Sequence, residues 1–385
     1  MTCKERASHK VFAKAHRRTR REAVECRELE EHALKAKGGS GVNIGLKSKA
    51  FMGLVSAAAL FASAQLGAAQ EVKVPYVKET ATQARLAHAL TEGSPYDIGA
   101  QRFADLVDVY TRGEVNFKIF PNAQLGLEQA TAKDTQLGLL EGSLVAINNA
   151  TQWYPPLDVT LLPFIFRDRE HVNTVIYGDI GKELFEGYRE ASGMRIVSIL
   201  EWGDRGIMNN IRPITSVEDL SGIKLRLPKN STMIDTYSAL GANPTAIDWG
   251  ELYSALQQGV ADGLEGPPQG MIDMKFTDFL DYYSYVPVFH GLAVILVNDT
   301  WFQSLSEENQ QAILRAGHEA GEYQRWISAK SHVNGLAALA ELGVEVNVIE
   351  DVEPFIEATK GIYESNRDRI GSEWIERVQN AGLEE

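Results

Sequence analysis

The chain has 385 residues, of which 44% are hydrophobic and 23% charged, which is typical of a globular protein long enough to form two lobes. Residues 1–49 hold 13 basic and 6 acidic side chains, a net charge of +7, whereas the rest holds 25 basic and 46 acidic ones, a net charge of −21. So acidic a body argues against nucleic acid as a partner, because phosphates require a basic face.

An uncharged run, AFMGLVSAAALFASAQLGAA, occupies residues 50–69 and follows Lys47 and Lys49. It ends in small residues suited to cleavage near Ala69, and no basic cluster follows it. These features predict a secretory signal peptide, so that residues 1–69 are a leader and the mature protein is periplasmic. An uncleaved anchor and a buried helix are the alternatives.

The two cysteines, Cys3 and Cys26, both fall in that leader. The mature chain would therefore contain no disulfide, thiolate nucleophile or cysteine metal site.

From residue 84 onward, apolar alternation and helical periodicity take turns. Expected strands are 84–90, 115–121, 143–148, 194–200, 241–244, 261–264, 290–298 and 344–349; expected helices are 97–112, 126–140, 249–259 and 306–342, with further helical segments up to about residue 191 and in the tail. The segment 306–342, with Ser306 as its N-cap, reads as one long helix or two abutting ones. The alternation predicts an α/β protein that binds its ligand at the ends of strands.

Two arginines stand close to such strand ends. Arg226 lies in GIKLRLP, a short apolar alternation ended by proline, and Arg205 comes about twenty residues earlier, after the expected strand 194–200 and a turn at Gly203. A buried arginine costs several kcal/mol unless an anion pairs with it. The anion could be a ligand carboxylate or one of the many acidic side chains of the chain itself.

Five motifs occur in the order of a known family: FPNAQLG at 120–126, LPFIF at 162–166, RPITSVEDLSGIKLRLP at 212–228, GANPT at 241–245 and ELYSALQQGVADGLEGP at 251–267. Together they resemble the extracytoplasmic solute-binding proteins of TRAP (tripartite ATP-independent periplasmic) transporters, in their C4-dicarboxylate-binding type. The resemblance covers residues 84–374.

The resemblance implies a two-lobe α/β fold, like that of type II periplasmic binding proteins, with hinge strands and a long supporting helix. Lobe one would comprise residues 71–202 and 291–330, and lobe two residues 203–290 and 331–385. It also implies that the protein captures an organic acid in the periplasm and delivers it to the membrane permease subunits of a TRAP transporter.

In the family, the arginine matched by Arg226 forms a two-pronged salt bridge with the ligand carboxylate, and the one matched by Arg205 assists it. A planar guanidinium suits this role because its parallel N–H bonds fix the plane of a carboxylate. Asn149 follows a lobe-one strand where relatives place a polar contact, with a helix cap as the alternative. Gly266 replaces an asparagine that many relatives carry, which suggests a smaller or more apolar acid and room beside the glycine.

Three tryptophans, Trp153, Trp202 and Trp249, fall where relatives face the crevice, and they could form an aromatic wall. Packing in the core or the hinge is the alternative for each. Glu265, beside Gly266, is the least expected contact for an anion, because like charges repel, and a structural or water-bridging role is the alternative.

The sequence contains no H-E-x-x-H, G-x-S-x-G or P-loop motif, so we expect a monomeric binding protein rather than an enzyme, without cofactor or metal. The alternatives are a ligand-binding partner of a periplasmic sensor and, less expected, a periplasmic enzyme on the same fold.

Overall fold

The computed structural model describes residues 81–383, so the expected leader and signal peptide at 1–69 lie outside the described residues. Within 81–383, no helix is both long and apolar enough to cross a lipid bilayer.

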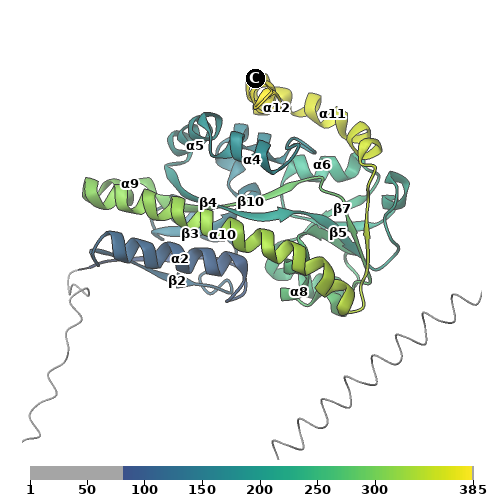
Figure 1. Cartoon of the computed structure of the whole chain (residues 1–385), viewed down its shortest axis with the longest axis horizontal. Coiled ribbons are helices and arrows are strands. Elements are labelled where there is room, and N and C mark those ends of the chain that lie inside the picture. The colour runs from purple at the N-terminus through teal and green to yellow at the C-terminus, as the bar shows by residue number, and fades with distance from the viewer. Residues whose placement is uncertain (1–80, 384–385) are drawn as a thin grey trace, which may run out of the picture. The chain divides into compact units, whose positions relative to one another are not determined.

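One sheet has five strands in the order β2-β1-β3-β10-β4 (Figure 1). Their bounds are Thr82–Ala87 (β1), Val115–Phe120 (β2), Gly142–Ala146 (β3), Met194–Asp204 (β4) and His290–Asn298 (β10). β1 runs parallel to β2 and β3, whereas β10 is antiparallel to β3 and β4. The parallel strands each lead into a helix, as the alternation predicted.

The other sheet has six strands in the order β11-β9-β5-β8-β6-β7. Their bounds are Gly206–Asn209 (β5), Lys224–Leu227 (β6), Asn243–Ala246 (β7), Gly263–Gly266 (β8), Tyr282–Tyr285 (β9) and Glu345–Val348 (β11). β6 is parallel to β7 and β8, and β5 is antiparallel to β8 and β9. The two sheets give the two-lobe α/β fold that was expected.

The α-helices cover the sheets and link them. Their bounds are Pro95–Tyr110 (α2), Glu128–Gln136 (α3), Arg169–Ile176 (α4), Asp179–Ser192 (α5), Ser231–Ala239 (α6), Leu252–Gln257 (α7), Pro268–Asp273 (α8), Asp299–Gln303 (α9), Glu307–Glu341 (α10), Glu353–Ile370 (α11) and Ser372–Asn380 (α12). Short 3-10 helices occupy Ile147–Asn149, Thr151–Trp153, Pro155–Leu161, Val217–Leu220, Trp249–Glu251 and Phe276–Asp278.

α10 is one continuous helix of 35 residues, capped by the Ser306 hydroxyl, which accepts from the Asn309 backbone N–H at 3.3 Å. It packs on α2 and on β4 of the first sheet, and farther along on α8 and on β11 of the second sheet. Figure 1 shows α10 running from α2 to α8. Its glycines serve close approach, because a Cβ on Gly317 would lie 1.8 Å from the Val197 carbonyl oxygen of β4. This helix therefore supports both sheets.

Two crossings join the sheets. β4 is longer than expected: it continues through Gly203, at φ +81°, to Asp204, and Arg205 alone separates it from β5. At the second crossing, between β9 and β10, the Phe289 carbonyl accepts from the Arg205 backbone N–H at 3.3 Å. Arg205 is therefore held at the junction of the two lobes.

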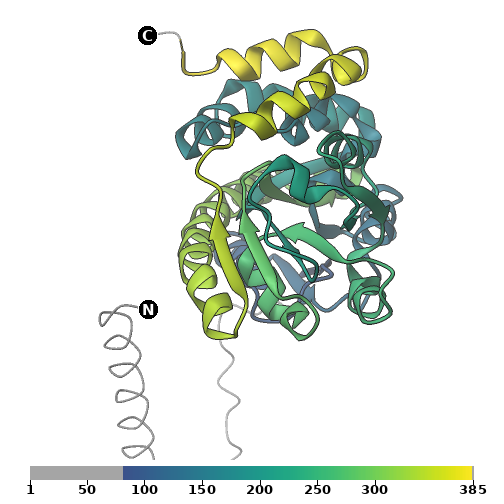
Figure 2. The same cartoon turned by 90° about the vertical axis from the view of Figure 1, so that its right-hand side faces the viewer.

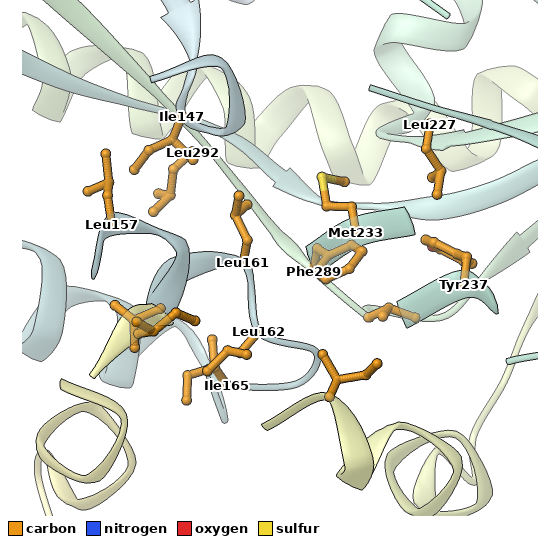
Figure 3. Packing of buried hydrophobic residues seen from close by; sticks show 14 of the residues in the cluster. Ile147, Leu157, Leu161, Leu162, Ile165, Leu227, Met233, Tyr237, Phe289 and Leu292 are labelled. Atoms are coloured by element: carbon orange, nitrogen blue, oxygen red, sulfur yellow. The ribbon is translucent and has the colours of Figure 1, made fainter. Parts of the chain in front are cut away.

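A shared hydrophobic cluster lies beside these crossings. Figure 3 shows Ile147, which directly follows β3, and Leu292 of β10 in the same cluster as Met233 and Tyr237 of α6. Tyr237 contacts the ring of Phe289, at a centroid distance of 5.9 Å. The tail helices α11 and α12, uppermost in Figure 2, cover this side. Because α11 packs on both α6 and Pro155–Leu161, the exact lobe bounds stay a prediction.

Candidate functional site

A cavity of about 40 Å³ lies between the two sheets, and it is called the arginine cavity here. Its wall combines residues on or after strands of both lobes: Ala89, Leu90, Leu127, Glu128, Gln129, Ala146, Asn148, Asn149, Trp202, Arg205, Arg226, Pro228, Asp248 and Trp249. Five of the eight expected site residues meet in it, namely Arg226, Arg205, Asn149, Trp202 and Trp249.

Arg226 lies on β6 and is only 3% exposed. Its Nε donates to the Ile247 carbonyl at 2.7 Å, while its two terminal nitrogens have no hydrogen-bond or ion-pair partner within residues 81–383. Burial lowers the pKa of Arg226 to about 10, since desolvation outweighs the attraction of more distant carboxylates. A buried guanidinium with free N–H groups facing a cavity is suited to bind a carboxylate.

Arg205 also lines the arginine cavity, but its charge is already balanced. Its Nε donates to Oε2 of Glu265, and its Nη2 donates to Oε1 of the same side chain at 2.6 Å. Burial alone would lower the pKa of Arg205, and Glu265 more than offsets this, so the pKa is raised. The structural ion pair left open from the sequence is therefore present, and Glu265 takes two of the five N–H donors of Arg205.

Two tryptophans support the arginines. Trp202 and Trp249 meet edge to face at 5.6 Å, with Trp249 beneath the Arg226 guanidinium and Trp202 beneath that of Arg205. The Nε1 atoms of both indoles are buried and have no hydrogen-bond partner among the described residues. These rings hold the guanidinium groups by cation–π contact.

The opposite wall is polar and contains a residue that the sequence reasoning missed. Glu128, the first residue of α3, accepts from the Ala146 backbone N–H at 3.3 Å and from the Asn149 side-chain amide. Burial raises the pKa of Glu128 to about 7, although Arg226 and Arg205 both act to lower it. Acidic residues are common at helix N-termini because of the helix dipole, so nothing in the local pattern indicates that Glu128 faces a cavity.

The other three expected site residues do not line the arginine cavity. Glu265 is fully buried as the partner of Arg205, and Trp153 packs on the hydrophobic cluster around the crossings. A Cβ on Gly266 would lie 2.7 Å from Cε of Met271, and the Gly266 carbonyl accepts from the Tyr283 hydroxyl at 3.0 Å. The flexible side chain of Met271 therefore occupies the space beside Gly266 in this structure, and the room that the glycine was expected to leave for a ligand stays a prediction.

Within the described part of the chain, no group of three or more His, Cys, Asp or Glu side chains is arranged to hold a metal ion. What the cavity offers chemically is one unneutralised cation, two tryptophan rings and several amides. This set recognises an anion with further hydrogen-bonding groups, and it contains no nucleophile paired with a base.

The family model for bacterial extracellular solute-binding proteins of family 7 matches residues 86–368. The chain is 29% identical over 274 residues to the 2,3-diketo-L-gulonate-binding periplasmic protein of Escherichia coli, covering 71% of this chain and 83% of that protein. It is 28% identical over 310 residues to the C4-dicarboxylate-binding periplasmic protein of Rhodobacter capsulatus, covering 78% and 91%.

Two solved structures of TRAP periplasmic solute-binding proteins are similar over the same region. One, from Roseobacter denitrificans with bound β-D-glucuronate, has a TM-score of 0.75 and 28% identity, covering 78% of this chain and 100% of that one. The other, from Polaromonas sp. with bound D-erythronate, has a TM-score of 0.76 and 28% identity, covering 78% and 99%.

Proposed function

Since the chain belongs to the bacterial extracellular solute-binding proteins of family 7, we propose that its arginine cavity binds a hydroxylated monocarboxylic acid through Arg226. The protein is a solute-binding protein that captures an organic acid for a TRAP transporter. The proposal concerns which acid it takes and how.

The observation that carries the proposal is the unpaired, buried guanidinium of Arg226. A ligand carboxylate would accept two parallel N–H bonds from it, each worth roughly 1.5–3 kcal/mol as a charge-assisted hydrogen bond. Arg205 contributes less, because Glu265 already takes two of its donors. Because Arg226 is the one cation of the cavity without an ion-pair partner among the described residues, a ligand with one carboxylate fits the site better than a ligand with two.

The body of the ligand is expected to carry hydroxyl groups. Asn148, Asn149, Glu128 and Gln129 form the wall opposite Arg226, and hydroxyls can both donate to and accept from such side chains. Gly266 does not line the arginine cavity, so the more apolar acid suggested by that glycine has no support in the wall of the cavity. The glucuronate and erythronate bound by the two similar structures are acids of the hydroxylated kind.

Capture would proceed by closure of the two lobes about the crossings at Arg205 and Phe289. An acid that contacts Arg226 of lobe two and Asn149 of lobe one favours the closed form by its differential affinity for the two states. We further propose that residues 50–69 export the protein to the periplasm and that it delivers the acid to TRAP permease subunits as a monomer.

The test is calorimetry of the purified protein with erythronate, gluconate, glucuronate, succinate and phenylacetate. We expect at least one of the three hydroxylated monocarboxylates to bind with a dissociation constant near 1 μM, about −8 kcal/mol. Succinate and phenylacetate should bind at least tenfold more weakly than that acid. Preference for succinate or phenylacetate would contradict the ligand class, and an Arg226→Met variant that still binds would contradict the site.

A further inference from the structure

A second cavity adjoins the arginine cavity and shares Gln129, Asn148 and Asn149 with it. We call this second cavity the annexe; its remaining wall includes Gln152 from lobe one and Ser231 from the start of α6. Its volume is about 190 Å³, against about 40 Å³ for the arginine cavity. A ligand whose carboxylate binds Arg226 therefore finds more free volume in the annexe than in the arginine cavity itself.

A hydrogen-bond network within the protein fixes one wall of the annexe. Asn230 is 5% exposed, and its amide donates to Asp158 at 2.9 Å and to the Thr151 hydroxyl at 3.2 Å. The carbonyl oxygen of the same side chain accepts from the Met233 backbone N–H at 3.1 Å, so it also caps α6. This network spans residues of both lobes and holds the walls in fixed positions.

One buried amide on the shared wall is free. Asn148 is 6% exposed, and its side chain makes no hydrogen bond with any residue in the described range. Its amide atoms are not among those enclosed by protein, so a ligand in either cavity can reach them. A hydroxyl group satisfies both the donor and the acceptor of such an amide, which indicates a hydroxylated occupant at the junction of the two cavities.

The charges of the annexe are already paired. Lys229 forms an ion pair with Asp248 at 2.8 Å, and Arg369 pairs with the buried Asp158. Both cations that line the annexe are therefore already neutralised by protein carboxylates, so they provide no site for a second carboxylate of the ligand. The chemistry of its wall fits a neutral, hydroxyl-rich group rather than the far end of a dicarboxylic acid.

The volumes set the size of that group. At about 10–15 Å³ per water, the arginine cavity has space for roughly three waters and the annexe for on the order of a dozen or more. Bonded atoms lie closer together than waters do, so the annexe exceeds what the body of one sugar acid fills. We propose that the annexe binds the second, neutral sugar ring of an acidic disaccharide whose carboxylate sits on Arg226. This proposal rests on the proposed function, because the acid end must occupy the arginine cavity.

The experiment compares gluconate with three 4-O-glycosyl gluconates (cellobionate, maltobionate and lactobionate) by calorimetry on the purified protein. At least one disaccharide acid is expected to bind tenfold or more tightly than gluconate. Ser231→Trp, which plugs the annexe from lobe two, should lower this ratio at least tenfold, and Gln152→Trp should do the same from lobe one. Ser372→Trp is the matched control, because Ser372 is also an exposed first residue of a helix, and it should leave the ratio unchanged.

The proposal is overturned if none of the three disaccharide acids binds more tightly than gluconate, or if the preference survives both plugs. Binding of gluconate alone would leave the proposed function standing and remove the annexe from it. If neither gluconate nor any other hydroxylated acid binds, the proposed function itself fails, and this inference fails with it.

Discussion

Replacing Arg226 by methionine is expected to stabilise the ligand-free protein while abolishing acid binding. Burial lowers the pKa of Arg226 to about 10, and at about 1.4 kcal/mol per pKa unit the buried charge costs about 3 kcal/mol. Because the folded pKa is depressed, this cost is fully present at pH 7 and is relieved only as the pH rises through about 10. The variant also loses the hydrogen bond to the Ile247 carbonyl, which destabilises it by about 1 kcal/mol. The free energy of unfolding should therefore rise by about 2 kcal/mol in total.

The assay is thermal unfolding at pH 7 with and without a bound acid. The melting temperature of ligand-free Arg226→Met should rise by a few degrees, on the order of 2–4 °C per kcal/mol, and the shift induced by the acid should disappear. Loss of two charge-assisted hydrogen bonds, about 3–6 kcal/mol together, corresponds to two to four decades in dissociation constant. Arg85→Met is the control, since Arg85 pairs with Glu141 at the surface. A ligand-free variant that melts below the wild type would show that the protein itself already neutralises Arg226.

Three further predictions follow from other buried groups. Burial raises the pKa of Glu128 to about 7, and a bound anion beside it would raise this pKa further, so the affinity for the acid should fall by up to about tenfold per pH unit above pH 7. Calorimetry at pH 6 and pH 8.5 should show this fall for the wild type and no pH dependence for Glu128→Gln. An affinity that rises with pH would contradict the prediction. Glu265→Gln leaves the charge of Arg205 buried and unpaired and should destabilise the protein by about 3–5 kcal/mol in urea unfolding; a loss below 1 kcal/mol would show that Arg205 does not depend on it. Gly317→Ala brings a Cβ within 1.8 Å of a backbone oxygen of β4 and should cost about 3 kcal/mol by the same assay, whereas Gly361→Ala, which meets no atom within 4 Å, should be neutral or stabilising.

Local patterns predicted the elements well wherever a strand or helix is decided by its own residues. β10 has the expected bounds, because a nine-residue run that is mostly apolar and contains three β-branched residues favours a buried strand. α10 was expected as one helix or two, and its continuity depends on Gly317 packing against β4, which the sequence does not show. β4 runs four residues past its expected end because Gly203 pairs with Gly291 across the sheet.

The site was predictable where one residue carries the chemistry and unpredictable where partners come from distant strands. Arg226 follows from an arginine in a short apolar strand. Glu265 is sixty residues from Arg205 in the chain. It neutralises Arg205 because β5 pairs with β8 in a register that places Ile207 opposite Glu265. The side chain of Met271 occupies the space beside Gly266 in this structure for the same tertiary reason, which a missing side chain in a motif does not show.

The most direct measurement is a crystal structure of the protein with its tightest-binding acid. We expect one carboxylate of the ligand to accept two hydrogen bonds from Arg226, at about 2.7–2.9 Å, while Glu265 remains paired with Arg205. A complex in which the carboxylate lies elsewhere, or in which Glu128 or Glu265 pairs with Arg226 in its place, would contradict this expectation.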